Sequence, residues 1–333
     1  ILYFIIKPDH CGKEFLELLI KKQKAGVQVR LIYDDFGSLF THTRFFKPLR
    51  DVGGKVYPFF PVRYYMPLGV NLNYRNHRKI VVVDGDIAYI GGSNIAKDYI
   101  GENKRLNPWR DTHIRITGNA VSMLNVRFLQ DYNFASGENA LQEVKYFDEE
   151  IGHEMIQIVS DGPDSQSVGI ETAYIKAIYS ARKSVILQTP YLILDEPFKL
   201  ALISAVKSGV NVKIMIPGIP DKRFVYSSTM SNAIELSQNG VEIYIHKGFL
   251  HSKTLCIDNE ISSIGTFNLD IRSFKLHFEV TAFIYGENMA NQLTEDYSNE
   301  LKNCKIIDEE FIKNRTLYEK FKERIAILFS PLL

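Results

Sequence analysis

Three features are scarce in this sequence, and each scarcity argues against a class of protein. The few cysteines are scattered without metal-ligand spacing, which argues against a disulfide framework and favours a reducing compartment (Cys11, Cys256 and Cys304). The 40 basic and 39 acidic side chains leave a net charge of +1, without the surplus typical of a nucleic-acid binder. The apolar run 1–6 is far shorter than the about 20 residues that cross a bilayer. It predicts a strand, and we expect a further segment to precede it.

The length and composition predict a globular protein with two lobes. The 333 residues, of which 45% are apolar, exceed what one hydrophobic core usually holds. A cluster of turn residues lies near the middle of the chain, at Ser160 to Asp164. We therefore expect an N-terminal lobe over 1–159 and a C-terminal lobe over 160–333.

Helical patterns alternate with short β-branched runs. An amphipathic helix over Lys13 to Ala25 precedes a strand over Gly26 to Tyr33, and a helix over Pro197 to Ser208 precedes a strand over Gly209 to Ile216. Strands separated by helices of this size predict an α/β fold with mixed, mostly parallel sheets.

One pattern occurs twice, in identical register. The residues of the first copy recur in the second at an offset of 174 positions: His77, Lys79, Asp84, Gly91 and Asn94, then His251, Lys253, Asp258, Gly265 and Asn268. Such a match without a gap is hard to obtain by accident, so we interpret the chain as one long unit used twice.

The spacing within each copy suits the binding of a phosphodiester. In a strand, side chains two apart share a face, so His77 projects with Lys79 and His251 with Lys253. Lysines neutralise phosphate oxygens, and imidazole is a nucleophile or an acid and base near neutral pH. The glycines let the backbone approach an anion, and polar neighbours are expected to donate to the phosphate (Ser93, Asn94, Thr266 and Asn268).

Each histidine also needs a partner that fixes its tautomer. Candidates begin the next strand in each half: Asp111, 34 residues after His77, and Glu279, 28 residues after His251. The alternative for both is a solvated surface charge. Asp84 and Asp258 belong to the doubled motif and are grouped with its catalytic residues. We rank structural support of nearby turns above direct chemistry for both of them.

The doubled His-x-Lys-x4-Asp pattern resembles the phospholipase D superfamily and, within it, the bacterial cardiolipin synthases. The resemblance extends over essentially the whole chain, and the stretches that carry it include 33–38, 73–85, 91–99, 109–113, 189–191, 251–258 and 265–280. Departures from the family pattern, which bear on the choice of acceptor, are Arg78, Leu192 to Leu194, and Thr281.

The resemblance implies two pseudo-symmetric α/β/α lobes with the active site at their interface. It further implies a phosphatidyl transfer between two phosphatidylglycerol molecules through a phosphohistidine, without metal or cofactor. His77 is assigned as nucleophile and His251 as acid and base by analogy, although the symmetry of the motifs does not choose between them. The implied partners are phosphatidylglycerol and the membrane surface, not nucleic acid, with the catalytic part on the cytoplasmic side of the cell membrane.

Other functions use the same residues. Water in place of the acceptor alcohol gives a phospholipase, a basic groove would give a nuclease, and loss of activity would leave a scaffold.

The aromatic stretch Phe59 to Leu68 is expected either to dip into a bilayer interface or to pack between the lobes.

Overall fold

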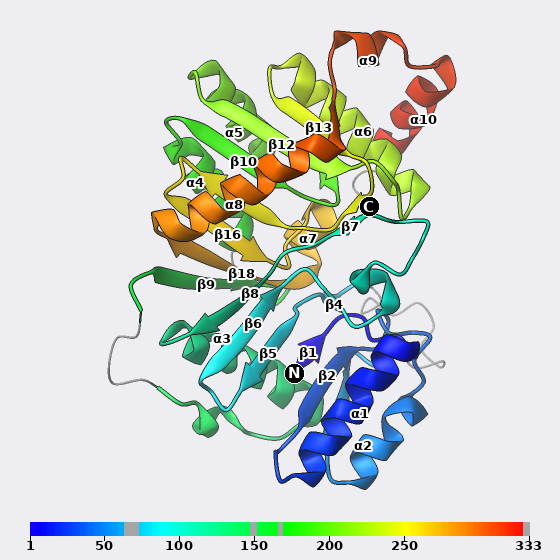
Figure 1. Cartoon of the computed structure of the whole chain (residues 1–333), viewed down its shortest axis with the longest axis vertical. Helices are drawn as coiled ribbons and strands as arrows, with labels where there is room; N and C mark the ends of the chain where they lie inside the picture. The colour runs from blue at the N-terminus through cyan, green and yellow to red at the C-terminus, as the bar shows by residue number, and fades with distance from the viewer. Residues whose placement is uncertain (63–72, 147–151, 166–168, 329–333) are drawn as a thin grey trace.

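The computed structural model describes residues 1–62, 73–146, 152–165 and 169–328, which form two mixed sheets covered by helices (Figure 1). The first sheet has the order β3 (Lys55–Phe59), β2 (Arg30–Asp34), β1 (Leu2–Tyr3), β5 (Ile80–Val83), β6 (Ile87–Gly91) and β8 (His113–Thr117). The second has the order β19 (Cys304–Ile306), β13 (Glu242–His246), β12 (Asn211–Pro217), β10 (Ser184–Gln188), β15 (Thr254–Ile257), β16 (Ile261–Gly265) and β18 (His277–Tyr285).

Helices lie on both faces of each sheet, which confirms the expected α/β/α layers. In β2, Leu31 packs with α1 and α2, whereas its neighbour Ile32 packs on the opposite face with α3. In the second half, α4, α5 and α6 cover one face and α8 the other (Figure 1). The helices are α1 (His10–Lys24), α2 (Lys47–Asp51), α3 (Ala120–Ser136), α4 (Gly169–Ser180), α5 (Glu196–Lys207), α6 (Arg223–Gln238), α7 (Ile271–Lys275), α8 (Glu287–Glu300), α9 (Glu309–Lys313) and α10 (Leu317–Leu328).

The helix and strand patterns read from the sequence match α1, β2, α5 and β12 with shifts at their ends. The largest shift is at β2, which starts at Arg30 because Gly26, with φ +94, ends the turn after α1. Strand β9 (Met155–Asp161) lies across the expected boundary between the lobes and pairs with β18 of the second sheet.

The expectation of mostly parallel sheets is wrong for the strands that carry the doubled motif. Strands β3, β2 and β1 run parallel, as do β13, β12 and β10. From β5 and β15 onward, however, each sheet continues with antiparallel neighbours. The short turn after each motif strand accounts for the antiparallel pairs β5–β6 and β15–β16, because only antiparallel strands are joined by a tight turn.

Two short strand pairs join the halves and position the site. β4 (Arg75–Asn76) runs parallel to the start of β18, and β7 (Trp109–Arg110) runs parallel to β14 (Phe249–Leu250). A third pair, β11 (Leu192–Ile193) with β17 (Leu269–Asp270), lies within the second half. His77 directly follows β4, and His251 directly follows β14.

No helix within the described ranges is long and apolar enough to cross a bilayer. Most of the aromatic stretch Phe59 to Leu68 lies outside the described residues. Its beginning packs in the core, since Phe59 is buried against Phe278 of β18.

Candidate active site

The two motif histidines are paired with carboxylates from the opposite halves. In the β4–β18 pair, Arg75 lies opposite His277 and Asn76 opposite Phe278, so that His77 follows beside Glu279. His77 Nδ1 lies 2.9 Å from Glu279 Oε1, although 202 residues separate them in the chain. From the sequence, each carboxylate follows the histidine of its own half. In the fold, each histidine instead contacts the carboxylate of the other half.

The second histidine, His251, is likewise paired with a carboxylate of the other half. In the β7–β14 pair, Arg110 lies opposite Leu250, which places His251 beside Asp111. His251 Nδ1 lies 2.7 Å from Asp111 Oδ2, and the His251 amide donates to the Arg110 carbonyl at 2.7 Å. Both carboxylates therefore lie where they accept an Nδ1–H bond, and both are buried.

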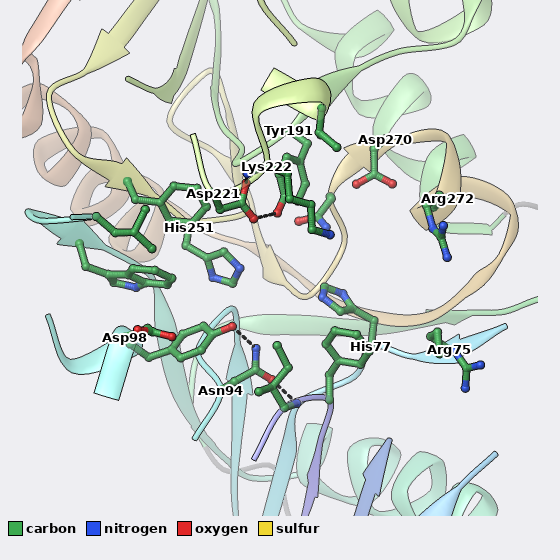
Figure 2. A pocket seen from close by; sticks show the side chains of 18 of the residues that line it. Arg75, His77, Asn94, Asp98, Tyr191, Asp221, Lys222, His251, Asp270 and Arg272 are labelled. Carbon is green, nitrogen blue, oxygen red and sulfur yellow. Dashed lines mark hydrogen bonds between the residues drawn. The ribbon is translucent and has the colours of Figure 1, made fainter. Parts of the chain in front are cut away.

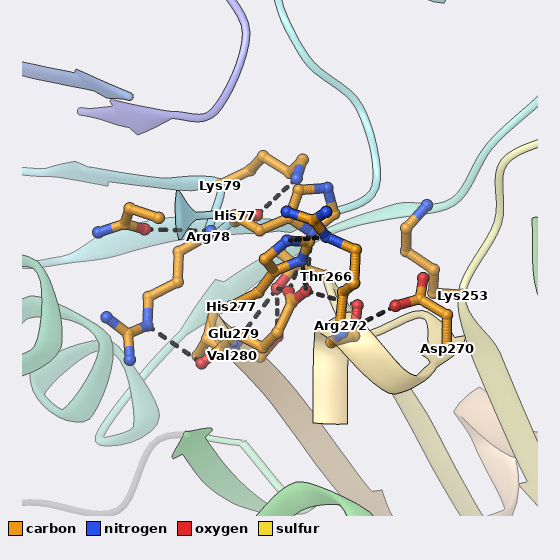
Figure 3. A network of polar contacts seen from close by, with 12 residues as sticks. His77, Arg78, Lys79, Lys253, Thr266, Asp270, Arg272, His277, Glu279 and Val280 are labelled. Carbon is orange, nitrogen blue, oxygen red and sulfur yellow. Dashed lines mark hydrogen bonds and ion pairs between the residues drawn. The ribbon is translucent and has the colours of Figure 1, made fainter. Parts of the chain in front are cut away.

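Glu279 is held by a dense set of donors (Figure 3). Its carboxylate accepts from Thr266 Oγ1 at 2.5 Å and from Ser273 Oγ at 3.1 Å. Its backbone carbonyl accepts from Nε of Arg78 at 3.0 Å, and the same guanidinium forms an ion pair with Asp131 at 2.9 Å. Arg78, which departs from the wider family pattern, thus ties the first motif to the strand that carries Glu279.

Gly265 of the motif and Gly92, which follows the motif glycine Gly91, allow the close approach of strands and of Asp111. A Cβ on Gly92 would lie 2.1 Å from Asp111 Oδ1, and a Cβ on Gly265 would lie 2.5 Å from the Val280 carbonyl oxygen. A side chain at Gly92 would therefore displace the partner of His251. The expectation that the glycines admit a substrate anion is replaced by this packing reason.

The motif lysines are buried, and Figure 3 shows Lys79 next to His77. Lys79 Nζ donates to the carbonyl of His77 and Lys253 Nζ to that of His251, each at 2.5 Å. Neither lysine lines the cavity in front of the histidines. Their charges reach a phosphate there through a medium of low dielectric, in which electrostatic attraction is strong.

Burial and the carboxylates together define the protonation of the site. Burial lowers the pKa of His77 and of His251, which favours neutral rings. Burial alone raises the pKa of a carboxyl, but His77 and Lys79 hold the pKa of Glu279 well below its usual range. An ionised carboxylate accepts the Nδ1–H of each neutral ring, so Nε2 carries the lone pair.

Both histidines line one cavity of about 600 Å³, and Figure 2 shows their rings pointing into it. Beside His77 the wall carries Arg75, Arg272 and His277, and beside His251 it carries aromatic rings, Asp221 and Lys222. The Trp109 and Tyr99 rings lie 5.3 and 5.4 Å from the His251 ring. The cavity is thus symmetric in its histidines and asymmetric in its walls.

The fold brings only part of the predicted set into this cavity. Asn94 and Asn268 line it, but the Asn94 amide already bonds to the Ile5 N–H at 3.0 Å and to Tyr99 Oη at 2.7 Å. Ser93 does not line the cavity, and Thr266 contacts Glu279 beneath it. The expectation that Thr266 binds phosphate is therefore replaced by support of Glu279.

Asp84 and Asp258 lie in hairpin turns outside the cavity, both with φ of 55°. The Asp258 carboxylate accepts the backbone N–H groups of Arg182, Lys183 and Ser184 at 2.7 Å each. Both aspartates thus lie in turns, and the Asp258 carboxylate stabilises the segment that leads into β10, in line with the structural support that we ranked above direct chemistry.

Several cavity residues escaped the sequence reasoning. Asp221, Asp98 and His277 carry no repeated or spaced pattern, and Phe4, whose ring lies 4.8 Å from that of His77, looks like an ordinary core residue. Only the family resemblance pointed to Trp109 and Tyr191, because they lie in the stretches 109–113 and 189–191 that carry it.

By spacing, one group among the described residues could hold a metal ion. Ligand atoms of His77, His277 and Glu279 lie within 4.8 Å of one another. Glu279 already accepts hydrogen bonds from His77, Thr266 and Ser273. This saturation with protein donors favours a hydrogen-bonded histidine–carboxylate pair over a metal site.

The lysines predict how anion binding varies with pH. Burial lowers the pKa of Lys79 to about 7 and that of Lys253 to about 8. Both charges are therefore present below pH 7 and are lost as the pH rises through this range. We expect sulfate, whose own charge is constant there, to inhibit about tenfold more weakly at pH 9 than at pH 6. Inhibition constants measured across this range would test it, and equal constants would contradict it.

The matched control for this pH effect is Lys253→Met. Removing one of the two titrating charges should weaken sulfate inhibition at pH 6 and flatten its pH dependence. A Lys253→Met protein with the wild-type pH dependence would show that the lysines are not its cause.

Comparison with known proteins adds sequence relatives over the whole chain. The family described as "Cardiolipin synthase, PLD-like domain" matches residues 1–113 and 174–301. A cardiolipin synthase of Listeria welshimeri is 43% identical over 338 residues, which cover 100% of this chain and 70% of the relative. The major cardiolipin synthase of Bacillus subtilis is 44% identical over 336 residues, covering 99% of this chain and 69% of the relative.

A solved structure shares the fold. The crystal structure of phosphatidylserine synthase from Haemophilus influenzae Rd KW20 superposes with a TM-score of 0.75 at 14% sequence identity. The match covers 100% of this chain and 89% of the other. At this identity the likeness concerns the arrangement of the two halves and not the substrate.

Proposed function

Because the chain belongs to the cardiolipin synthase family of phospholipase D-like phosphatidyltransferases, we propose that it joins two phosphatidylglycerol molecules into cardiolipin and glycerol. The reaction passes through a phosphatidyl-histidine. Its residues are the two motif histidines, the two carboxylates that hold them and the two buried lysines. Phosphatidylglycerol is reached at a membrane surface.

In the first step, Nε2 of His77 attacks the phosphorus of one phosphatidylglycerol. A P–N bond forms, the P–O bond to the head-group glycerol breaks, and the departing alkoxide takes a proton from Nε2 of His251. His251 is an acid in this step only while protonated, and Asp111 stabilises that imidazolium. The charges of Lys79 and Lys253 stabilise the pentacoordinate phosphorus.

In the second step, the terminal hydroxyl of another phosphatidylglycerol attacks the same phosphorus. Neutral His251 takes the hydroxyl proton as the new P–O bond forms, and the P–N bond to His77 breaks. His77 then returns to its neutral state with its Nδ1–H bonded to Glu279. Proton and electron counts balance over the two steps, and no further reagent is consumed.

The observation that carries this proposal is the pair of crossed histidine–carboxylate bonds facing one cavity. A lone hydrogen-bonded histidine is common in protein cores. Two of them, in identical register and each backed by a buried lysine, supply a nucleophile and a separate acid for one phosphorus. That arrangement suits a double displacement.

Product analysis tests the proposal directly. Purified protein is incubated with vesicles of radiolabelled phosphatidylglycerol, and the lipids and released glycerol are quantified. We expect cardiolipin and glycerol in equal amounts, because each transfer releases one glycerol. Phosphatidic acid as the sole lipid product would instead identify a hydrolase.

A further inference from the structure

The cavity wall beside His251 contains a feature that phosphate binding alone does not explain. Asp221 lies in the loop before α6, next to His251 in the cavity (Figure 2). Its negative charge acts on Lys253 as well. A carboxylate repels a phosphodiester and weakens its binding, so its presence in the cavity calls for a ligand group that donates hydrogen bonds.

Two neighbouring groups donate hydrogen bonds to Asp221 and hold its carboxylate in place. The Tyr191 hydroxyl donates to Asp221 Oδ2 at 2.5 Å, and the Lys222 amide donates to Oδ1 at 2.7 Å. A carboxylate has about four lone-pair sites, so these two bonds leave acceptor capacity on Asp221. Because β11 and β17 run parallel with Leu192 opposite Leu269, Tyr191 lies beside Asn268.

Asn268 supplies the second, independent observation. It is 4% exposed and lines the cavity, and its Oδ1 is buried without a hydrogen-bond partner. A buried acceptor without a donor is costly, and a ligand that supplies one removes the cost. Its counterpart in the first half differs, because Asn94 Oδ1 already accepts from the Ile5 amide.

We propose that Asp221, Tyr191 and Asn268 form a head-group subsite that binds the hydroxyl groups of a glycerol head group. The inference rests on the proposed function, in which the leaving and entering head groups both lie opposite His77 and therefore beside His251. Acceptors at that position take hydrogen bonds from the hydroxyl that does not react. The subsite thereby selects a polyol over an alcohol with a single hydroxyl.

Two arginines mark the opposite end of the cavity. Arg75 and Arg272 lie beside His77, and Arg272 Nε lies 3.4 Å from His277 Nε2 (Figure 2). The two arginines favour an anion at that end, whereas the free acceptor positions of Asp221 and Asn268 favour the hydroxyl groups of a head group beside His251. The two ends are thus distinguished although the catalytic motifs are repeated.

A competition between two alcohols tests the subsite. The donor is phosphatidyl-p-nitrophenol in detergent micelles, and glycerol and 1-propanol compete as acceptors at equal concentration. We expect wild-type protein to form phosphatidylglycerol over phosphatidylpropanol by about tenfold or more, because a site built for a hydroxyl discriminates against its absence. Asp221→Ala should lower this ratio to within about threefold of unity. Tyr191→Phe should lower it by a smaller factor.

The ratio is measured within one protein sample, so partial unfolding does not alter it. The matched controls are Asp51→Ala on the exposed end of α2 and Tyr179→Phe on the surface of α4, which should keep the wild-type ratio. A wild-type ratio near one, or a ratio unchanged in Asp221→Ala, would overturn the subsite while leaving the transfer intact. Absence of transfer to any alcohol by wild-type protein would overturn the proposed function instead.

Discussion

Replacing His77 by alanine is expected to abolish turnover of phosphatidylglycerol, with a loss of at least about 10⁴-fold in kcat. The change removes the atom that forms the P–N bond, so the covalent route is closed. His251→Ala leaves that atom in place and removes the acid and base, for which we expect a loss of roughly 10²- to 10⁴-fold.

A donor with a better leaving group separates the two histidines. p-Nitrophenolate departs from phosphatidyl-p-nitrophenol without a proton, so the first step no longer needs an acid. His251→Ala should then release a burst of one p-nitrophenolate per protein molecule and stall, because the second step still needs a base. His77→Ala should give no burst, and stopped-flow absorbance measures both.

The control is His153→Ala, which removes an exposed histidine and should turn over normally. A burst from His77→Ala and none from His251→Ala would reverse the assignment of the two roles. Near-normal turnover of phosphatidylglycerol by either alanine variant would rule out the two-histidine scheme.

The second large effect is expected at the carboxylates. Glu279→Gln keeps the shape of the side chain but removes the charge that fixes the His77 tautomer and offsets its positive charge when phosphorylated. We expect kcat to fall roughly 10²- to 10⁴-fold with little change in KM, as for a carboxylate that orients a catalytic imidazole. Asp111→Asn should have an effect of similar size through His251.

The pairing of each histidine with a carboxylate of the other half predicts which reaction step each carboxylate variant slows. Glu279 belongs to the second half but contacts His77, so Glu279→Gln should slow the burst with phosphatidyl-p-nitrophenol, which His77→Ala abolishes. Asp111 belongs to the first half but contacts His251, so Asp111→Asn should keep the burst and lose the steady state. The assay is the burst measurement described for the histidines.

The control for charge removal is Glu309→Gln on the exposed α9, and melting temperatures establish that the variants are folded. Should Glu279→Gln keep a normal burst while Asp111→Asn loses it, each carboxylate would act within its own half. Normal kcat in both variants would show that the buried carboxylates have no part in positioning the rings.

Much of the site was predictable from the sequence because its residues lie close together in the chain. The repeat of His77 and Lys79 at the same spacing as His251 and Lys253 indicates two copies of one unit. Strand alternation did not predict the place of the lysines, because both His-x-Lys segments precede their strands and only the histidines line the cavity. The family resemblance rests on the same local pattern, which also predicted the helices and strands before each motif. From the sequence, we ranked structural support first for the aspartates of the motif, which lie in turns.

The sequence alone thus determined the doubled motif, the α/β layers and the pair of candidate carboxylates. Only the tertiary structure decided which carboxylate serves which histidine, since the β4–β18 and β7–β14 pairs cross between the halves. Tertiary contacts also placed Asp221 beside His251 and left Asn268 Oδ1 without a partner. A local pattern can be read from the sequence because its residues are neighbours in the chain, whereas the crossed pairs join residues 202 and 140 positions apart and depend on how the two sheets meet.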